Sequence, residues 1–257
     1  MTAATPPAVG LEGRRAIVTG AGRGIGRGCA LALAAASAPV TLVARSRKEL
    51  ELVAAEIEEA GGTADVVVAD VCDPDQVAAA VAAAAEHDDL WICVNNAGVN
   101  RPGPTTELPL ADFDTVIDVN VRGTFIVTQA VARVLLERGR GGRIVNLSSQ
   151  MGVVGYPGRA AYCAAKHAVN GLTKALAVEW AREGITVNAV APTFVETPMT
   201  RGMLEDEEFR RDVLGRIPMG RLGTIDEVVA AVLFLASPAA ALVTGHVLGV
   251  DGGWTAW

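Results

Sequence analysis

The chain has 257 residues, of which 51% are hydrophobic and 20% are charged, and its formal net charge is −7. The length fits one large domain or two small ones with a substantial buried core. The acidic balance argues against a nucleic-acid-binding protein, because a phosphate backbone needs a basic patch. The four cysteines and three histidines are scattered and form no CxxC pair, so no metal site is expected and the thiols are typical of a reducing compartment.

No stretch of the sequence is predicted to enter a membrane. The first residues, MTAATPPAVG, lack the basic and apolar regions of a signal peptide. The longest apolar stretch, 228–243, has 16 residues and contains Ser237 and Pro238, so it is too short and too broken to span a bilayer. We therefore expect a cytoplasmic protein without a membrane partner.

Along the first half of the chain, apolar runs rich in β-branched residues alternate with alanine-rich helical segments. The helical segment 47–61 is amphipathic and stops at Gly61 and Gly62, a common signal for a helix C-terminus. The periodicity predicts strands and helices in strict alternation. The strands are at 15–20, 39–44, 64–70 and 90–98, and the helices are at 24–36, 47–61 and 74–87.

The alternation continues in the second half, with a polar, mixed stretch at 193–223. Continuous apolar strands separated by helices indicate a parallel sheet covered on both faces. No break in composition and no repeat marks a second domain, so we predict a single doubly wound α/β domain of Rossmann type over residues 1–257, with a seven-stranded parallel sheet. The remaining strands are at 142–149, 185–192 and 246–253, and the remaining helices are at 111–138, 159–183 and 224–237.

The first strand-to-helix turn, TGAGRGIG at 19–26, has the glycines that a phosphate-binding loop needs. Glycine permits positive φ and lets a pyrophosphate approach the helix N-terminus, where free N–H groups favour anions. In a doubly wound fold, ligands bind beyond the carboxyl ends of the strands. The turn therefore predicts a dinucleotide site, with a glycine-rich loop that binds nothing as the alternative. Its candidate residues are Gly20, Gly22, Arg23, Gly24, Ile25 and Gly26.

The end of the second strand favours one form of the dinucleotide. NAD-selective folds usually place an acidic residue here to bind the ribose 2′-hydroxyl, whereas this chain has Ala44 followed by Arg45 and Ser46. The guanidinium of Arg45 can bind a 2′-phosphate through two hydrogen bonds, and Arg23 can add a second positive charge. NADP(H) is therefore favoured over NAD(H); the alternative is that Arg45 simply opens the next helix in solvent.

An ordered series of motifs over nearly the whole chain resembles the short-chain dehydrogenase/reductase family. TGAGRGIG resembles the TGxxxGxG loop of that family, VNNAG at 94–98 its NNAG segment, and VTGHVLGVDGG at 243–253 its last strand. Asn120 falls at the active-site asparagine, Ser149 at the family serine, and Tyr162 and Lys166 at the YxxxK motif. The resemblance implies an NAD(P)-dependent oxidoreductase, nearest to the branch of 3-oxoacyl-(acyl-carrier-protein) reductases and sugar-acid or polyol dehydrogenases.

Tyr162 and Lys166 suit the interconversion of a secondary alcohol and a ketone. Lys166 lies one helical turn after Tyr162 on the same face, so its ammonium is expected to stabilise the tyrosinate and lower a phenol pKa of about 10. Tyr162 can then exchange a proton with the substrate oxygen. Ser149, at a strand end, is placed to hydrogen-bond that oxygen. The alternatives are an ordinary surface pair for Tyr162 and Lys166 and a turn serine for Ser149.

The family resemblance assigns further residues to the cofactor. It implies that Lys166 also holds the nicotinamide ribose and that Asn120 anchors a water that links Lys166 to solvent. A structural role is the alternative for Asn120, and a helix N-cap is the alternative for Asp70. The other cofactor residues that the resemblance implies are Asp70 and Val71 at the adenine, Asn96, Ala97 and Gly98 at the ribose and nicotinamide, Val195 and Thr197 at the carboxamide, and Pro192.

One departure from the family pattern lies after the sixth strand, where Pro192 is followed by Thr193 instead of glycine. Because threonine lacks the conformational freedom of glycine, the geometry of this loop stays open. The segment 194–221 is predicted to be a lid that orders on binding. Arg201 on this lid can recognise an anionic substrate, with a solvated lid arginine as the alternative.

The substrate is expected to be a small carbonyl or alcohol compound. Ser149 and five residues that follow strand ends are candidates for its binding surface: Gln150, Met151, Tyr156, Phe194 and Met199. Family members commonly form tetramers through the helices that carry Asn120 and Tyr162, so the resemblance also implies a homotetramer. The competing hypotheses are a non-catalytic cofactor-binding regulator on the same fold and an NAD-dependent sugar or polyol dehydrogenase.

Overall fold

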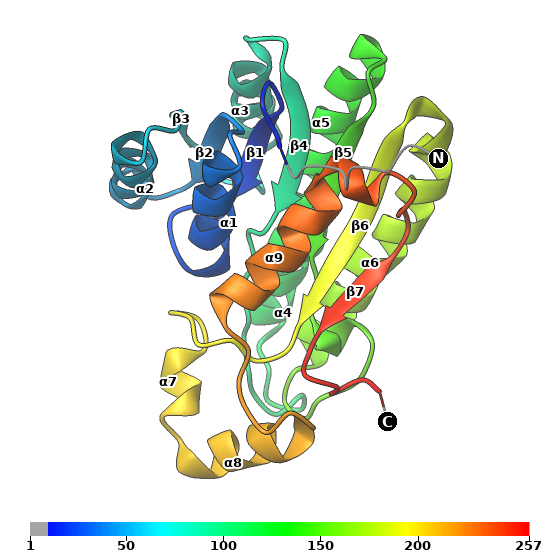
Figure 1. Ribbon diagram of the computed structural model, residues 1–257. Coiled ribbons are helices and arrows are strands. Elements are labelled where there is room, and N and C mark those ends of the chain that lie inside the picture. Colours follow the sequence, from blue (N-terminus) through cyan, green and yellow to red (C-terminus); the bar gives the residue numbers. More distant parts are fainter. Residues whose placement is uncertain (1–9, 257) are drawn as a thin grey trace, which may run out of the picture.

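Seven short strands form one parallel sheet at the centre of the computed structural model (Figure 1), which describes residues 10–256. Their spatial order is β3-β2-β1-β4-β5-β6-β7, and every neighbouring pair is parallel. The prediction of a doubly wound seven-stranded sheet is confirmed, although the predicted range 1–257 extends beyond the described residues at both ends. The strands are β1 Arg15–Thr19, β2 Val40–Ala44, β3 Ala64–Val68, β4 Leu90–Asn95, β5 Gly142–Leu147, β6 Ile185–Pro192 and β7 Val247–Val250.

Helices cover both faces of the sheet, because most strands carry apolar side chains on both of their faces. In β1, Ala16 and Val18 face one apolar layer, whereas Ile17 between them faces the other. The first layer contains α1 Gly24–Ala35, α2 Arg47–Glu59 and α9 Ile225–Ala236. The second contains α3 Pro74–Ala85, α5 Thr124–Arg138 and α6 Ala160–Trp180.

The predicted helix 111–138 is interrupted in the structure. It divides into α4 Leu110–Ile117, a π-helical turn at Asp118–Gly123, and α5. The π turn is stabilised by Asn120, whose Nδ2 donates to the Val116 carbonyl oxygen at 2.8 Å, and by Thr124, whose Oγ1 donates to the Asn120 carbonyl oxygen at 2.8 Å. The apolar pattern is the same for an α-helix and a π turn, so the sequence did not reveal the interruption.

The segment after β6 has helical structure of its own, which the sequence did not predict. It contains α7 Arg201–Leu204 and α8 Glu207–Arg216, and both lie beyond the carboxyl ends of the central strands (Figure 1). The last strand was predicted to reach residue 253 but ends at Val250. There, the Asp251 carboxylate accepts hydrogen bonds from the backbone N–H groups of Gly253 and Thr255, which turns the chain out of the sheet.

One helical stretch among the described residues, Leu110–Arg138, is long and apolar enough by composition to cross a membrane. In the fold its second half instead covers the sheet. Val131 of α5 is fully buried there, and Val127 and Leu135 on the same face are each 2% exposed. The stretch therefore has the packing of a core helix, and its apolar composition follows from that position.

A buried polar network connects the sheet to the helices beneath the site. Asn95 Nδ2 donates to Thr128 Oγ1 and to Asn146 Oδ1, each at 2.8 Å. Asn146 Nδ2 in turn donates to Thr173 Oγ1 of α6 at 2.9 Å. Because β4 and β5 are neighbours, these bonds fix both strands to α5 and α6 just before the strands reach the carboxyl edge of the sheet.

Asn146→Leu is expected to lower the free energy of unfolding by about 2–3 kcal/mol, because the buried Asn95 amide and the buried Thr173 hydroxyl each lose one hydrogen-bond partner. The matched control is Thr41→Val, since the Thr41 hydroxyl is buried in β2 without a hydrogen-bond partner. Removal of this hydroxyl is expected to leave the free energy of unfolding unchanged or to raise it. Urea unfolding followed by circular dichroism measures both changes, and equal losses in the two variants would contradict the role given to the network.

Candidate active site

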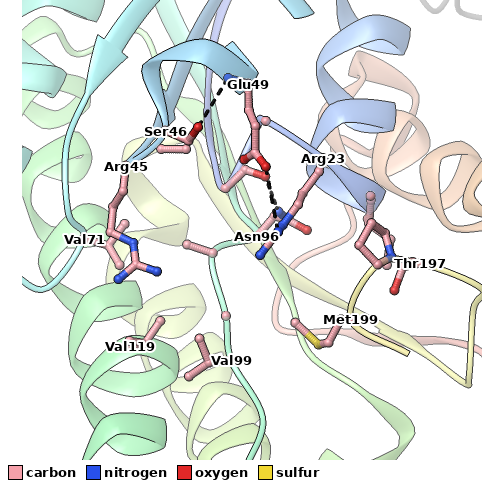
Figure 2. Close-up of a pocket in the computed structure, with 18 of the residues that line it drawn as sticks. Arg23, Arg45, Ser46, Glu49, Val71, Asn96, Val99, Val119, Thr197 and Met199 are labelled. Carbon is pink, nitrogen blue, oxygen red and sulfur yellow. Dashed lines mark hydrogen bonds and ion pairs between the residues drawn. The ribbon is translucent and has the colours of Figure 1, made fainter. Parts of the chain in front are cut away.

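A cleft of about 460 Å³ opens beyond the carboxyl ends of β1, β2, β3 and β4, at the point where the strand order reverses (Figure 2). This is where doubly wound folds bind dinucleotides, and its size suits a ligand of that class. Most of the predicted cofactor residues line it. They are Gly20, Gly22, Arg23, Gly24, Ile25, Arg45, Ser46, Asp70, Val71, Asn96, Ala97, Gly98 and Thr197.

The glycine loop has the conformation that a phosphate-binding turn requires. Gly20 and Gly24 have φ of +64° and +56°, which other residues rarely adopt. Gly26 does not line the cleft, and its role is packing. A Cβ atom there would lie 2.2 Å from the Gly20 carbonyl oxygen and 2.3 Å from the Asn96 amide nitrogen. Only glycine therefore allows α1 to begin this close to the end of β4.

The N-terminus of α1 is available to an anion. Arg23 occupies its N-cap position with an extended backbone, and the Arg23 side chain caps none of the free N–H groups. Helix N-termini with free N–H groups bind phosphates, which satisfy these donors and interact favourably with the helix dipole. The turn, its glycines and this uncapped helix end fit the pyrophosphate of a dinucleotide.

The floor of the cleft is held by hydrogen bonds between the ends of β1 and β4. The Thr19 hydroxyl accepts from the backbone N–H groups of Asn96 and Ala97, both at 3.1 Å. The Asn96 side chain donates to the carbonyl oxygens of Thr19 and Gly20 at 3.0 and 3.1 Å. Asn96 thus positions the glycine loop.

Two arginines and two carboxylates border the end of the cleft where the adenosine is expected. Figure 2 labels both arginines and one of the carboxylates, Glu49. Arg45 Nη1 lies 3.8 Å from Asp70 Oδ2, and Arg23 Nη1 lies 3.8 Å from Glu49 Oε1. The two arginine side chains are 74% and 70% exposed, so each can move to bind an incoming phosphate.

Glu49 is a cleft residue that sequence reasoning missed. The signal that could have found it is the pattern Ser46-x-x-Glu49 at the start of α2. Ser46 caps this helix by accepting from the Glu49 N–H, a capping pattern that places residue 49 at the same helix end as the cleft.

Asp70, which lines the cleft, does not cap α3, because Asp73 is the N-cap and the Asp70 carboxylate accepts from the Cys72 N–H.

The cofactor candidates at and after the end of β6 lie around the cleft rather than on its wall. Pro192 and Val195 are buried and are not among the lining residues. Thr193, which replaces the family glycine, has no positive φ, and its backbone N–H donates to the Val250 carbonyl oxygen. The substitution therefore costs no backbone strain.

The YxxxK residues lie in the first two turns of α6, close to the end of β5. Lys166 is 5% exposed, and its Nζ donates to the Leu147 carbonyl oxygen at 2.7 Å and lies 5.5 Å from the centroid of the Tyr162 ring. Ser149 is 6% exposed; its hydroxyl donates to Gln150 Oε1 at 2.7 Å and accepts from the Met151 N–H. The chain thus places a hydroxyl, a phenol and an ammonium within one small region.

Asn120 is fully buried in the π turn, and its side-chain nitrogen and oxygen both form hydrogen bonds with the backbone. Its Nδ2 donates to the carbonyl oxygens of Val99 and Val116, and its Oδ1 accepts from the Val99 N–H. Val99 lines the nucleotide cleft. In this structure Asn120 therefore positions the loop after β4, and its predicted role as a water anchor stays a prediction.

Comparisons with known proteins agree with this geometry. The sequence profile of the family described as enoyl-(acyl carrier protein) reductase matches residues 20–255. The chain belongs to the short-chain dehydrogenase/reductase family. It is therefore an oxidoreductase, as the motifs predicted.

Named relatives cover nearly the whole chain. Gluconate 5-dehydrogenase of Gluconobacter oxydans is 43% identical, covering 97% of this chain and 98% of the relative. The 3-oxoacyl-(acyl-carrier-protein) reductase FabG of Thermotoga maritima is 41% identical, covering 95% and 98%. The solved structure of a gluconate 5-dehydrogenase from Burkholderia cenocepacia in complex with NADP and tartrate has a TM-score of 0.93 and 39% identity, covering 97% of this chain and 98% of that one.

Four aromatic side chains, called here the aromatic cluster, pack together beside Tyr162. Two of them, Tyr156 and Phe194, were predicted substrate residues, and Met151 and Tyr162 pack against the same cluster. Ring centroids of the cluster lie 5.6–6.3 Å apart. The cluster consists of Tyr156, Phe194, Phe209 and Trp254.

Sequence reasoning missed Phe209 and Trp254, because they come from α8 and from the turn after β7, far from the catalytic motifs in the chain. Met199, another predicted substrate residue, lines the nucleotide cleft instead and is 50% exposed.

The pKa values of the predicted catalytic pair, Tyr162 and Lys166, move in directions that the sequence did not predict. Burial raises the pKa of Tyr162 to about 12, an effect that the Ser149 hydroxyl partly opposes. Burial also lowers the pKa of Lys166 to about 8. The expected lowering of the phenol pKa is therefore not found, because loss of solvent outweighs the attraction of an ammonium that donates to Leu147 instead of the phenol.

Lys166→Met is expected to raise the free energy of unfolding by about 2 kcal/mol at pH 7 while abolishing turnover. The folded pKa of about 8 lies below the ordinary value of 10.5, so between these values the unfolded chain binds more protons than the folded one. The cost of the buried charge is thus complete below about pH 8 and disappears as the pH rises toward 10.5.

Urea unfolding at neutral and at alkaline pH measures this effect, with Lys174→Met as the matched control because Lys174 is exposed on the same helix. The control is expected to change stability by less than about 0.5 kcal/mol at either pH. A Lys166→Met gain that is the same at both pH values would contradict the lowered lysine pKa.

Proposed function

We propose that this short-chain dehydrogenase interconverts a secondary alcohol and a ketone on a small hydroxy acid or polyol, with NADP(H) as the preferred cofactor. The observation that carries the proposal is the convergence of Ser149, Tyr162 and Lys166 beside the nucleotide cleft. Tyr162 and the cleft residue Val99 pack against the same apolar group on α4 and α6. Phenol and cleft are therefore neighbours, as hydride transfer between a cofactor and a substrate requires.

When bound, the nicotinamide cofactor supplies the hydride or accepts it. Side chains of this protein supply the hydrogen bond to the substrate oxygen, the proton and the positive charge that the reaction also needs. Ser149 holds the substrate oxygen through its hydroxyl, which is buried at the end of β5. Tyr162, whose raised pKa keeps it protonated at neutral pH, donates its proton to the carbonyl oxygen as negative charge develops there. Lys166, mostly ammonium at pH 7, stabilises the phenolate that remains.

The charges around the cleft support NADP(H). The carboxylates of Asp70 and Glu49 approach Arg45 and Arg23 only to 3.8 Å, so neither pair has the geometry of a tight hydrogen-bonded ion pair. A 2′-phosphate, which carries more charge and more acceptor oxygens, can replace these contacts with two-pronged hydrogen bonds to the arginines. The relative from Burkholderia cenocepacia is described with NADP, in agreement with this assignment.

Assembly and location belong to the same proposal. Apolar side chains are exposed on the helices that family members use to associate, among them Phe113, Phe125 and Leu136 on α4 and α5, and Val178 on α6. We infer a homotetramer whose interfaces cover these side chains.

The four cysteines are free thiols, which supports a reducing compartment such as the cytoplasm.

The residues that are present weigh against the alternative of a cofactor-binding regulator. A regulator has no use for a serine, a tyrosine and a buried lysine held together at a net cost in stability. Within enzymes, 3-oxoacyl reduction on a carrier protein is the second candidate, and the FabG relative favours it. An acidic carrier protein needs a basic docking patch, however, and the net charge of this chain is −7.

Tyr162→Phe is expected to lower kcat by about 10³-fold with any substrate, because the proton donor is lost. Binding of NADPH, measured by fluorescence titration, is expected to stay within about threefold of the wild type, since the cleft is intact. Turnover is measured with sugar acids, polyols and ketoesters through the absorbance of reduced nicotinamide. A wild-type protein that binds NADPH but turns over nothing in this panel would support the regulator instead.

Arg45→Ala is expected to raise the KM for NADP⁺ by about 10- to 100-fold and to leave the KM for NAD⁺ nearly unchanged, because a charged hydrogen bond to the 2′-phosphate is lost. Arg47→Ala is the matched control, since Arg47 is exposed, pairs with Glu51 and does not line the cleft. Parallel kinetics with the two cofactors measure the change. Equal effects on both cofactors, or a wild type that prefers NAD⁺, would refute the assignment to Arg45.

A further inference from the structure

Arg159 is a buried cation three residues before Tyr162. It occupies the N-cap position of α6 and is 7% exposed. Its Nη1 donates to the carbonyl oxygen of the preceding Gly158 at 3.0 Å, its Nη2 donates to Met203 Sδ at 3.2 Å, and its Nε is buried without a hydrogen-bond partner. Because a thioether sulfur is a weak acceptor, the edge of the guanidinium formed by Nε and Nη2 is almost unsatisfied.

The other two buried arginines in the described part of the chain have partners that Arg159 lacks. Arg15, 4% exposed, forms ion pairs with two carboxylates. Arg143, 7% exposed, also has a buried Nε without a partner, but its guanidinium carbon lies 4.4 Å from the centroid of the Trp91 ring. Within residues 10–256, Arg159 forms no ion pair, and the ring centroids closest to it are more than 5.5 Å away. Arg159 thus has neither the carboxylates of Arg15 nor the close aromatic ring of Arg143.

Such a group is costly in a folded protein. A buried charge loses its hydration and normally regains that free energy from a counter-ion. Burial lowers the pKa of the Arg159 guanidinium, which is the expected response to an uncompensated position. A buried polar group without partners calls for an explanation, and a ligand that completes its hydrogen bonds is one.

The surroundings of Arg159 place it on the substrate side of the site. Its guanidinium carbon lies 5.9 Å from the Tyr156 ring centroid and 5.7 Å from that of Phe209, two members of the aromatic cluster. Phe209 belongs to α8 and Met203 to α7, so the predicted lid covers the guanidinium from the other side. Arg159 therefore lies between the catalytic end of α6 and the lid.

We propose that Arg159 binds the carboxylate of an anionic hydroxy acid substrate through its Nε and Nη2 donors. The planar edge of a guanidinium matches the two oxygens of a carboxylate. To bind one there, Arg159 loses a single hydrogen bond, the weak one from Nη2 to Met203 Sδ. This inference rests on the proposed function and narrows its substrate from hydroxy acids and polyols to sugar acids. A carboxylate in this position lies beneath the residues of α7 and α8 that contact Arg159.

Arg201, the lid arginine that the sequence offered for an anionic substrate, is a poorer candidate. Its side chain is 66% exposed and its Nε lies 4.0 Å from Glu196. An exposed arginine that already has a carboxylate nearby contributes little to recognition. It carries the same charge on the same side of the site, however, which makes Arg201→Gln a matched control for Arg159→Gln.

The test compares sugar acids with polyols of the same carbon skeleton, namely D-gluconate with D-glucitol and D-galactonate with galactitol, oxidised with NADP⁺. The measured quantity is the ratio of kcat/KM for the acid to kcat/KM for the polyol. Arg159→Gln is expected to lower this ratio by about 30-fold, mainly through the KM of the acid, because a charge-assisted pair is lost. Arg201→Gln is expected to change it by less than about twofold.

Arg159→Lys covers the case in which the glutamine variant does not fold, as judged by thermal melting and NADPH binding. It keeps the charge and loses the two-pronged geometry, so the ratio is expected to fall by about fivefold, and an unchanged ratio overturns the proposal. Equal losses on acid and polyol, or a wild type that oxidises only polyols, overturn it as well while the proposed function stands. A wild type that oxidises neither member of any pair contradicts the proposed function itself.

Discussion

The site depends on the hydrogen bonds that join the end of β1 to the end of β4. These strands lie side by side although most of the first half of the fold separates them in sequence, and their carboxyl ends form the point where the strand order reverses. Thr19 and Asn96 exchange bonds across this point and hold the glycine loop against the NNAG segment. The position of α1, the width of the cleft and the path of the chain toward Val99 and Asn120 all follow from this contact.

Two buried cations without a carboxylate partner, Lys166 and Arg159, lie one turn after Tyr162 and three residues before it. Lys166 has a single carbonyl partner, and Arg159 has a neighbouring carbonyl and a thioether. These contacts do not compensate fully for the loss of hydration, so both residues lower the stability of the fold. Under the proposed function, this instability is retained for substrate binding and proton transfer.

Much of the fold and of the nucleotide cleft could be predicted from the sequence, because local patterns determine them. Continuous apolar runs mark strands that are buried on both faces, and a glycine loop between a strand and a helix has few other uses. Features that depend on contacts between residues far apart in the sequence could not be predicted from local patterns. The π turn at Asn120 has the apolar pattern of an ordinary helix. Phe209 and Trp254 reach the substrate side only through the tertiary fold, and the pKa shifts of Tyr162 and Lys166 depend on burial, which no spacing reveals.

The turn after β7 has a consequence for how this fold can change its chemistry. Trp254 is 7% exposed and packs against Phe194 and Tyr156, so under the proposed function this turn contributes to the substrate side of the site, whereas the glycine loop follows β1. Substitutions in the turn would then alter the volume and polarity around the substrate and leave the nucleotide cleft untouched. Substrate preference and cofactor preference could therefore diverge independently during evolution, because separate segments of the chain determine them.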